Sequence, residues 1–168
     1  NQTNSDNKCV ILDTMNFWLD NSFEELSKVI KKVNIIIIND EEALQLSGKD
    51  TLFNAADEIL KMGPKHVVIK KGEHGAMLFN KSEFFTIPAF PVKKVKDPTG
   101  AGDTFAGGFS GFLSQKNDLD FETLKLAVVH GTVMASFCVE GFGTSQMEKL
   151  NKETVEKRFK EFKKYTRY

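Results

Sequence analysis

The stretch NIIIIND at residues 34–40 is the feature that most constrains how this chain can fold. Its four isoleucines are consecutive, so an extended segment here carries apolar side chains on both faces. Such a strand needs cover on both faces, which is typical of a parallel sheet between two layers of helices. The rest of the sequence must therefore supply those helices and further strands.

Strand and helix patterns alternate along the rest of the sequence. Apolar runs predict a strand at 8–13 and three short strands within 65–88, with glycine turns between the first two and a polar turn before the third. Helical spacing of apolar residues predicts helices at 23–33, 41–48, 52–63, 104–115, 121–139 and 151–165. Strands alternating with helices, followed by a helical end, predict an α/β fold with a mostly parallel sheet.

The first strand pattern, KCVILD at 8–13, follows a polar start at 1–7 that we expect to be frayed. We expect this strand to be fully buried, and a buried parallel strand needs a neighbour on each side. Few candidate strands remain for that place. We therefore interpret residues 1–168 as a single partial domain, the later part of a larger one.

Polar and aromatic residues follow this strand directly. Asp13 and Asn16 come at its carboxyl end, where open α/β sheets bind ligands, although the sequence assigns them no definite role. Phe17 and Trp18 are interpreted as core residues.

Composition excludes some classes of partner. The 23 basic and 23 acidic residues balance, so no general electrostatic attraction to nucleic acid or an acidic membrane is expected. No segment resembles a signal peptide, and no apolar run approaches the length of a membrane span. Cys9 and Cys138 form no metal-binding pattern, so we expect two reduced thiols in a cytoplasmic protein.

The stretch DPTGAGDTF at 97–105 is interpreted as a turn that opens a helix. A phosphate loop of the GK[ST] type is excluded because Gly107, Gly108 and Phe109 follow, and a GxGxxG loop is excluded by Phe105. The glycines could serve only the turn geometry. Alternatively, the N–H groups of Gly100, Ala101 and Gly102 bind an anion at the positive end of the helix.

Asp103 is an acid at this helix start, where an anion would land. As a helix N-cap, Asp103 would accept a backbone hydrogen bond, which any Asp there can do. As a general base, its carboxylate would take the proton of a hydroxyl that attacks a phosphoryl group held by the N–H groups. The sequence leaves both roles open.

Four segments together resemble the PfkB, or ribokinase-like, carbohydrate kinase family. They are NDEEALQLSG at 39–48, VIKKGEHGAMLF at 68–79, DPTGAGDTFAGGF at 97–109 and VEGFGTS at 139–145, and they come in the family's order. The resemblance implies a ribokinase-like three-layer α/β/α fold of which this chain carries only the C-terminal part. The family's N-terminal half, with most acceptor contacts and a β lid, has no counterpart in this sequence.

The resemblance also implies an activity. By similarity to the family, the chain is an ATP-dependent kinase that transfers the γ-phosphoryl group to a hydroxyl of a sugar or nucleoside. Asp103 is then the general base, and Gly100, Ala101 and Gly102 form the anion hole. The implied cofactors are ATP and Mg²⁺, with K⁺ in many relatives. The alternative is a catalytically inactive nucleotide-binding fragment, or a partner-dependent subunit.

Five further residues match the family's nucleotide segments. Asn39 and Glu42 resemble the pair that orders Mg²⁺ through water, but their spacing is also that of a helix capping box. Lys70 could reach a phosphate or be an ordinary solvated lysine. Gly72 and Gly75 could contact the nucleotide or only supply turn geometry.

The last candidates are weaker. The monovalent-cation site of relatives matches Asp97, Thr99, Gly141 and Ser145, although Asp-Pro-Thr is also ordinary turn chemistry. His130 lies where relatives cover the adenine, but a packed histidine is the preferred interpretation.

Two surfaces complete the expectations. The final helix, at 151–165, could bind a membrane or a partner, but docking by its apolar stripe is favoured. An exposed sheet edge could let two copies of the chain associate.

Overall fold

The structure is a computed structural model that describes residues 9–116 and 118–167, so the frayed start expected at 1–7 lies outside the described residues. The described chain forms two compact units. The first unit contains the residues up to Lys71 together with Met77–Phe85, and the second contains Gly72–Ala76 and the residues from Thr86 onward.

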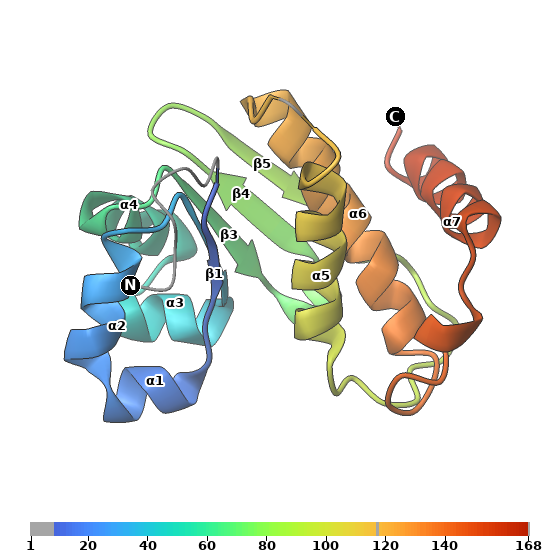
Figure 1. Ribbon diagram of the computed structural model, residues 1–168, viewed down its shortest axis with the longest axis horizontal. Helices are drawn as coiled ribbons and strands as arrows, with labels where there is room; N and C mark the ends of the chain where they lie inside the picture. The colour runs from blue at the N-terminus through green and yellow to red at the C-terminus, as the bar shows by residue number, and fades with distance from the viewer. Residues whose placement is uncertain (1–8, 117, 168) are drawn as a thin grey trace. The chain divides into compact units, whose positions relative to one another are not determined.

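The strands form one sheet in the order β1-β2-β3-β4-β5. Strand β1 (Ile11–Asp13) pairs in parallel with β2 (Ile35–Asn39), which pairs in parallel with β3 (His66–Lys70). Strands β4 (Ala76–Phe79) and β5 (Phe84–Ile87) follow, and their arrows alternate in direction in Figure 1. The predicted α/β class is confirmed, with a mixed sheet whose first three strands are parallel.

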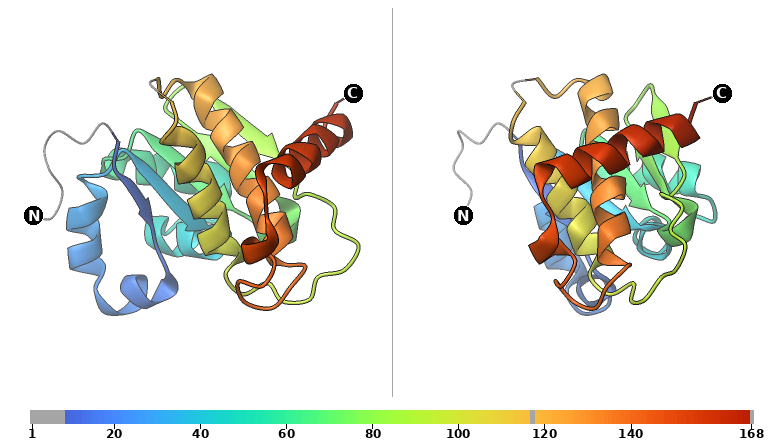
Figure 2. Two further views of the ribbon diagram at one scale, coloured as in Figure 1. Left: turned by 45° about the vertical axis from the view of Figure 1, so that its right-hand side comes forward. Right: turned by 90° about the vertical axis from the view of Figure 1, so that its right-hand side faces the viewer.

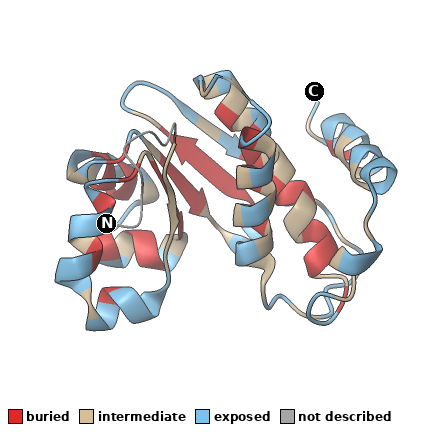
Figure 3. Cartoon of the chain, in the orientation of Figure 1, coloured by how far each residue is buried: buried red, intermediate tan, exposed pale blue. Residues whose placement is uncertain are grey.

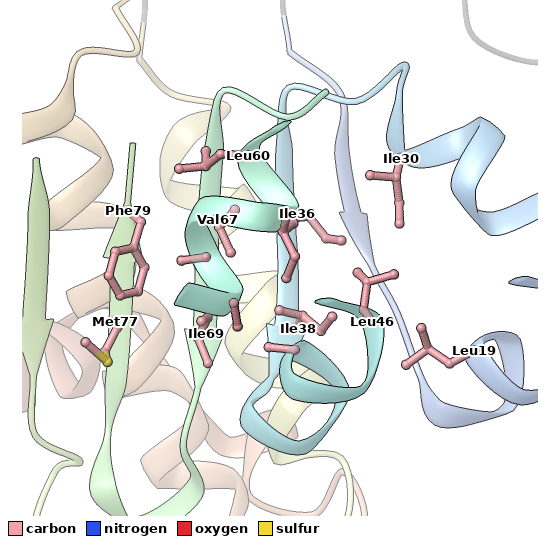
Figure 4. Packing of buried hydrophobic residues seen from close by; sticks show 14 of the residues in the cluster. Leu19, Ile30, Ile36, Ile38, Leu46, Leu60, Val67, Ile69, Met77 and Phe79 are labelled. Carbon is pink, nitrogen blue, oxygen red and sulfur yellow. The ribbon is translucent and has the colours of Figure 1, made fainter. Parts of the chain in front are cut away.

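The isoleucine run forms the centre of the first unit, as predicted. Residues 35–38 of β2 are between 0% and 1% exposed. In Figure 4, Ile36 and Ile38 of β2 lie beside Val67 and Ile69 of β3, within a cluster that the helices complete. Burial of one such side chain contributes about 1.5–3 kcal/mol, so this strand anchors the unit.

Strand β4 adds Met77 and Phe79 to that cluster, and four helices supply the rest, namely α1 (Asn16–Asn21), α2 (Phe23–Ile30), α3 (Asp40–Ser47) and α4 (Leu52–Met62). Helix α3 ends at Gly48, whose φ of 65° is left-handed, and α4 ends at Gly63. The Thr51 hydroxyl caps α4 by accepting from the Asn54 N–H. These ends agree with the predicted ones because glycine and hydroxyl residues mark them in the sequence.

The expected burial of β1 and its neighbours is wrong in two respects. Strand β1 is an edge strand of half-buried residues rather than a fully buried strand. Phe17 and Trp18 are 53% and 47% exposed, and their rings pack edge to face with centroids 5.2 Å apart. Helix α1 has six residues and presents only Leu19 to the core, so the two aromatic side chains project from its other faces.

The second unit is mainly helical, with α5 (Ala101–Leu113), α6 (Phe121–Cys138) and α7 (Lys152–Tyr165), and short 3₁₀ turns η1 (Gly72–His74) and η2 (Met147–Lys149). Helices α5 and α6 run side by side in Figures 1 and 2. Their close approach requires glycine. A Cβ at Gly131 would lie 2.9 Å from the Phe105 carbonyl oxygen, and one at Gly108 would lie 2.7 Å from Met134 Cγ.

Helix α7 docks by its apolar stripe, as favoured from the sequence. Phe162 is 1% exposed and packs on Phe90 with ring centroids 5.6 Å apart. Figure 3 shows most of the rest of the helix exposed. No helix in the described ranges is long and apolar enough to span a membrane.

Candidate functional site

In the first unit, polar side chains collect where the parallel strands end. Asp13 ends β1, Asn39 ends β2 and Lys70 ends β3, and the register pairs Asn39 with Lys70. The carboxyl ends of parallel strands form one edge of a sheet, which is the usual place for a ligand in open α/β folds. Glu42 joins them from the first turn of α3.

Asp13 and Lys70 form an ion pair at this edge. Lys70 Nζ lies 2.8 Å from Asp13 Oδ1 and 3.2 Å from Oδ2. The side chain of Lys70 is only 17% exposed and that of Asp13 only 25%, so water screens this pair less than a surface pair. Lys70 is therefore not the ordinary solvated lysine that the sequence left open, and Asp13 acquires a partner that the sequence did not reveal.

Asn39 and Glu42 form the predicted capping box. Asn39 Oδ1 accepts from the Glu42 N–H at 2.7 Å, and Glu42 Oε2 accepts from the Asn39 N–H at 3.2 Å. Glu42 is 4% exposed, and this burial raises the pKa of its carboxyl group, against the lowering effect of the Asn39 N–H and of Lys70. Nearby Asp13 adds to the increase, so the carboxylates of Asp13 and Glu42 and the Lys70 ammonium interact.

One hydroxyl at the same edge lacks a partner. Thr14 follows Asp13, and its Oγ1 is buried with no hydrogen bond to any group that the structure describes. A buried hydroxyl without a partner is energetically costly. At this edge, Asp13, Asn39 and Glu42 carry oxygen atoms of the kind that Mg²⁺ prefers.

The raised pKa of Glu42 predicts a pH-dependent effect of Glu42→Gln on stability. Protonated Glu42 is favoured in the folded state, so protonation stabilises the fold. This contribution to the free energy of unfolding is fully present below 4.5, the ordinary pKa of a glutamic acid, and is lost as pH rises through the raised pKa of the folded state. Glutamine keeps an oxygen for the capping box and carries no charge. We therefore expect Glu42→Gln to raise the thermal unfolding midpoint more at neutral pH than at pH 4.5.

Thermal unfolding followed by circular dichroism at the two pH values measures this difference. Glu41→Gln, at an exposed position in the same helical turn, is the matched control. An equal change for Glu42→Gln at both pH values would contradict the prediction.

In the second unit, the glycine loop leads into α5 as predicted, but the helix starts three residues early. Gly100 is the N-cap with φ of 79°, and Asp103 is the third helical residue. The N-cap interpretation of Asp103 is therefore wrong, because a left-handed turn at Gly100 starts the helix before the acid is reached. The Asp103 side chain is exposed and makes no hydrogen bond within the described chain.

The N–H groups at this helix start are mostly free. Among the described residues, the N–H groups of Gly100, Gly102 and Asp103 have no hydrogen-bond partner, whereas that of Ala101 donates to the Pro98 carbonyl at 3.1 Å. Three unpaired donors at the positive end of a thirteen-residue helix favour an anion. The structure thus adds the Asp103 N–H to the expected set and gives that of Ala101 a partner within its turn.

The loop before α5 is held from two sides. Asp97 Oδ1 accepts from the Thr99 N–H at 2.9 Å, and this hydrogen bond lowers the pKa of Asp97. The Val139 carbonyl accepts from the N–H groups of Lys96 at 2.7 Å and Asp97 at 3.4 Å. Cys138 Sγ donates to the Thr99 carbonyl at 3.5 Å. The end of α6 therefore fixes the loop.

The four residues of the predicted cation site come from these two joined loops. Asp97 and Thr99 lie in the loop before α5, and Gly141 and Ser145 lie in the loop after α6. A Cβ on buried Gly141 would lie 2.8 Å from Ser145 Oγ, so these two residues are in contact. No cluster of three or more His, Cys, Asp or Glu with metal-binding geometry occurs among the described residues.

The remaining candidates are Gly72, Gly75 and His130. Gly72 and Gly75 adopt φ of 53° and 90° in the turn after β3, which agrees with the turn-geometry interpretation. The His130 ring stacks between the rings of Phe112 and Phe159, with ring centroids 4.3 Å and 4.7 Å away. Burial lowers the pKa of His130. Both ring faces are covered by these two side chains, so His130 is packed and an adenine contact through its ring face is not available.

Both cysteines are free thiols, with Cys138 buried and Cys9 partly buried, as expected.

Comparisons with known proteins give matches over much of the chain. A family model described as pfkB family carbohydrate kinase matches residues 1–150. A cytidine kinase of Thermococcus kodakarensis is 38% identical over 97 residues, which are 56% of this chain and 34% of that protein.

Solved structures have a similar fold. An aminoimidazole riboside kinase of Salmonella enterica, complexed with aminoimidazole riboside and an ATP analogue, has a TM-score of 0.76 and 25% identity, covering 88% of this chain and 51% of its own. A provisionally named ribokinase II of E. coli, in complex with ATP and Mg²⁺, has a TM-score of 0.73 and 25% identity. The match covers 89% of this chain and 47% of the E. coli chain. The chain thus spans about a third of the curated relative and about half of the solved proteins.

Proposed function

Since the chain belongs to the pfkB family of carbohydrate kinases, we propose that it transfers the γ-phosphoryl group of ATP to a hydroxyl group of a sugar or nucleoside. Family membership and the likeness to solved proteins also confirm the predicted ribokinase-like α/β fold, of which the chain spans about half. We keep the interpretation that residues 1–168 are one partial domain as part of this proposal.

The start of α5 supports this function most strongly. Three unpartnered N–H groups, those of Gly100, Gly102 and Asp103, occur together with the exposed carboxylate of Asp103 in one helical turn. The N–H groups bind the phosphoryl oxygens and stabilise the negative charge that develops on them during transfer. The Asp103 carboxylate takes the proton of the acceptor hydroxyl as its oxygen attacks phosphorus.

The oxygen-rich edge of the first unit fits the cofactor. Asn39 and Glu42, with Asp13 beside them, would hold Mg²⁺ through water. When bound, Mg²⁺ neutralises phosphate charge. Lys70 has its charge balanced by Asp13 and can turn toward a phosphate that arrives at the same edge.

A monovalent cation is a further part of the proposal. Oxygen atoms of Asp97, Thr99, Gly141 and Ser145 belong to two loops that the Val139 carbonyl joins. A hard cation such as K⁺ prefers oxygen ligands of this kind. Bound there, it would order the loop that carries the N–H groups.

Release of ADP from Mg-ATP tests the proposed reaction. Purified protein is incubated with Mg-ATP alone and with separate sugars, sugar acids and nucleosides, and ADP is followed by a coupled assay. We expect at least one acceptor to accelerate ADP formation. The same rate with and without every acceptor would contradict kinase activity in this chain.

The alternative proposal is nucleotide binding without transfer. The chain spans about half of the solved relatives, and the proposed residues all serve the nucleotide, the cation or the proton transfer rather than recognition of the acceptor. A second polypeptide would then supply the acceptor site. Calorimetric binding of Mg-ATP without acceptor-dependent ADP formation would favour this alternative. Self-association through an exposed sheet edge such as β1 stays a prediction.

A further inference from the structure

Arg158 of α7 contacts three residues at the end of α6 and just beyond it. Its guanidinium lies 2.8 Å from Glu140 Oε2 and donates to the Ser136 hydroxyl at 3.1 Å. It also stacks on the Phe137 ring, with Cζ 3.5 Å from the centroid, and lies 5.0 Å from the centroid of Phe90. The Arg158 side chain is 18% exposed, so these interactions are partly shielded from water.

The segment that Arg158 contacts also holds the loop before α5. Cys138 donates to the Thr99 carbonyl, and the Val139 carbonyl accepts from the N–H groups of Lys96 and Asp97. Glu140, the next residue, pairs with Arg158. Three consecutive residues therefore connect α7 on one side to the loop of the proposed reaction on the other.

We propose that Arg158 is a positioning residue for phosphoryl transfer, an inference that rests on the proposed function. By fixing residues 136–140, it holds the Val139 carbonyl in place and thereby the loop at 96–100, which leads into the start of α5 where the free N–H groups lie. It acts through its protein partners Glu140, Ser136 and Phe137. Arg158 also lies beyond residues 1–150, the part of the chain that the family model matches.

Arginine suits this place better than lysine. A guanidinium can stack flat on an aromatic ring and still donate to a carboxylate and a hydroxyl in its own plane. The ammonium of lysine keeps the charge but loses the planar stacking and the fixed directions of its donors. Arg158→Lys should therefore retain the attraction to Glu140 but position the segment less firmly.

Amide hydrogen exchange tests this positioning without requiring turnover. We expect Arg158→Ala to accelerate exchange of the Lys96 and Asp97 N–H groups by about tenfold or more, and Arg158→Lys to have an intermediate effect. Phe162→Leu is the matched control, since it disturbs the packing of the same helix and of the neighbouring Phe90 but keeps the Glu140, Ser136 and Phe137 partners of Arg158. No acceleration, or equal acceleration in the Phe162 control, would overturn the proposal.

Steady-state kinetics add a second readout if the wild-type chain forms ADP. We expect Arg158→Ala to lower kcat by about 10- to 100-fold, because misplacement of a catalytic loop mainly costs the chemical step. The KM for Mg-ATP should change little, and Arg158→Lys should recover part of kcat. A change in KM alone would contradict positioning of the loop. If the wild-type chain forms no ADP, the proposed reaction fails and hydrogen exchange still decides the role of Arg158.

Discussion

Asp103→Asn is expected to lower acceptor-dependent ADP formation by about 10²- to 10⁴-fold, the usual contribution of a general base. Asparagine has nearly the same shape and leaves the free N–H groups at the start of α5 unchanged. It cannot accept the hydroxyl proton. The affinity for Mg-ATP, measured by calorimetry, should therefore stay close to that of the wild type.

A suitable control for this change is Glu153→Gln. Glu153 is also an exposed acid in the first turn of a helix, so its replacement alters charge and the helix dipole in a similar way. Equal rates for the Asp103 and Glu153 variants would show that Asp103 does not act as the base.

Gly75→Ala is expected to have the largest effect on stability. A Cβ at Gly75 would lie 2.0 Å from the Ile87 carbonyl oxygen and 2.5 Å from the Pro88 carbonyl carbon, and the backbone has a φ of 90°. The main chain must move because no flexible side chain can yield. Steric strain and the unfavourable φ together should cost about 3 kcal/mol or more in the free energy of unfolding.

Gly72→Ala provides the matched comparison in the same turn. Its φ is 53°, but no atom lies within 4 Å of an added Cβ, so only the left-handed backbone is penalised. The expected cost is about 1–2 kcal/mol. Urea denaturation measures both variants, and equal losses would contradict the close approach at Gly75.

Local patterns predicted much of the fold. Sequence spacing reveals features that are determined by residues close together in the chain. These features are the isoleucine run of β2, the glycines that end α3 and α4, and the capping box of α3. Burial at the edge of the sheet was not predictable in this way. Phe17 and Trp18 are apolar, but the short helix α1 presents a different residue to the core.

The candidate sites show the same division. The loop at 97–103 was found from its glycines, but the start of α5 depends on the left-handed turn at Gly100, which moved Asp103 out of the cap position. The pair of Asp13 and Lys70 joins residues 57 positions apart, so only strand pairing brings them together. The sequence singled out Asp13 by its position at a strand end and Lys70 by the family resemblance, but not their pairing, and no signal pointed to Arg158.

Selective ¹⁵N labelling of glycine, followed by NMR during titration with Mg-ATP, tests the proposed anion site most directly. The chain has 12 glycines, so the amide signals of Gly100 and Gly102 can be resolved and assigned by substitution. We predict large shifts of these two signals at saturating Mg-ATP and little change at Gly111, which lies near the other end of α5. Unchanged signals of Gly100 and Gly102 under those conditions would contradict phosphate binding at the start of this helix.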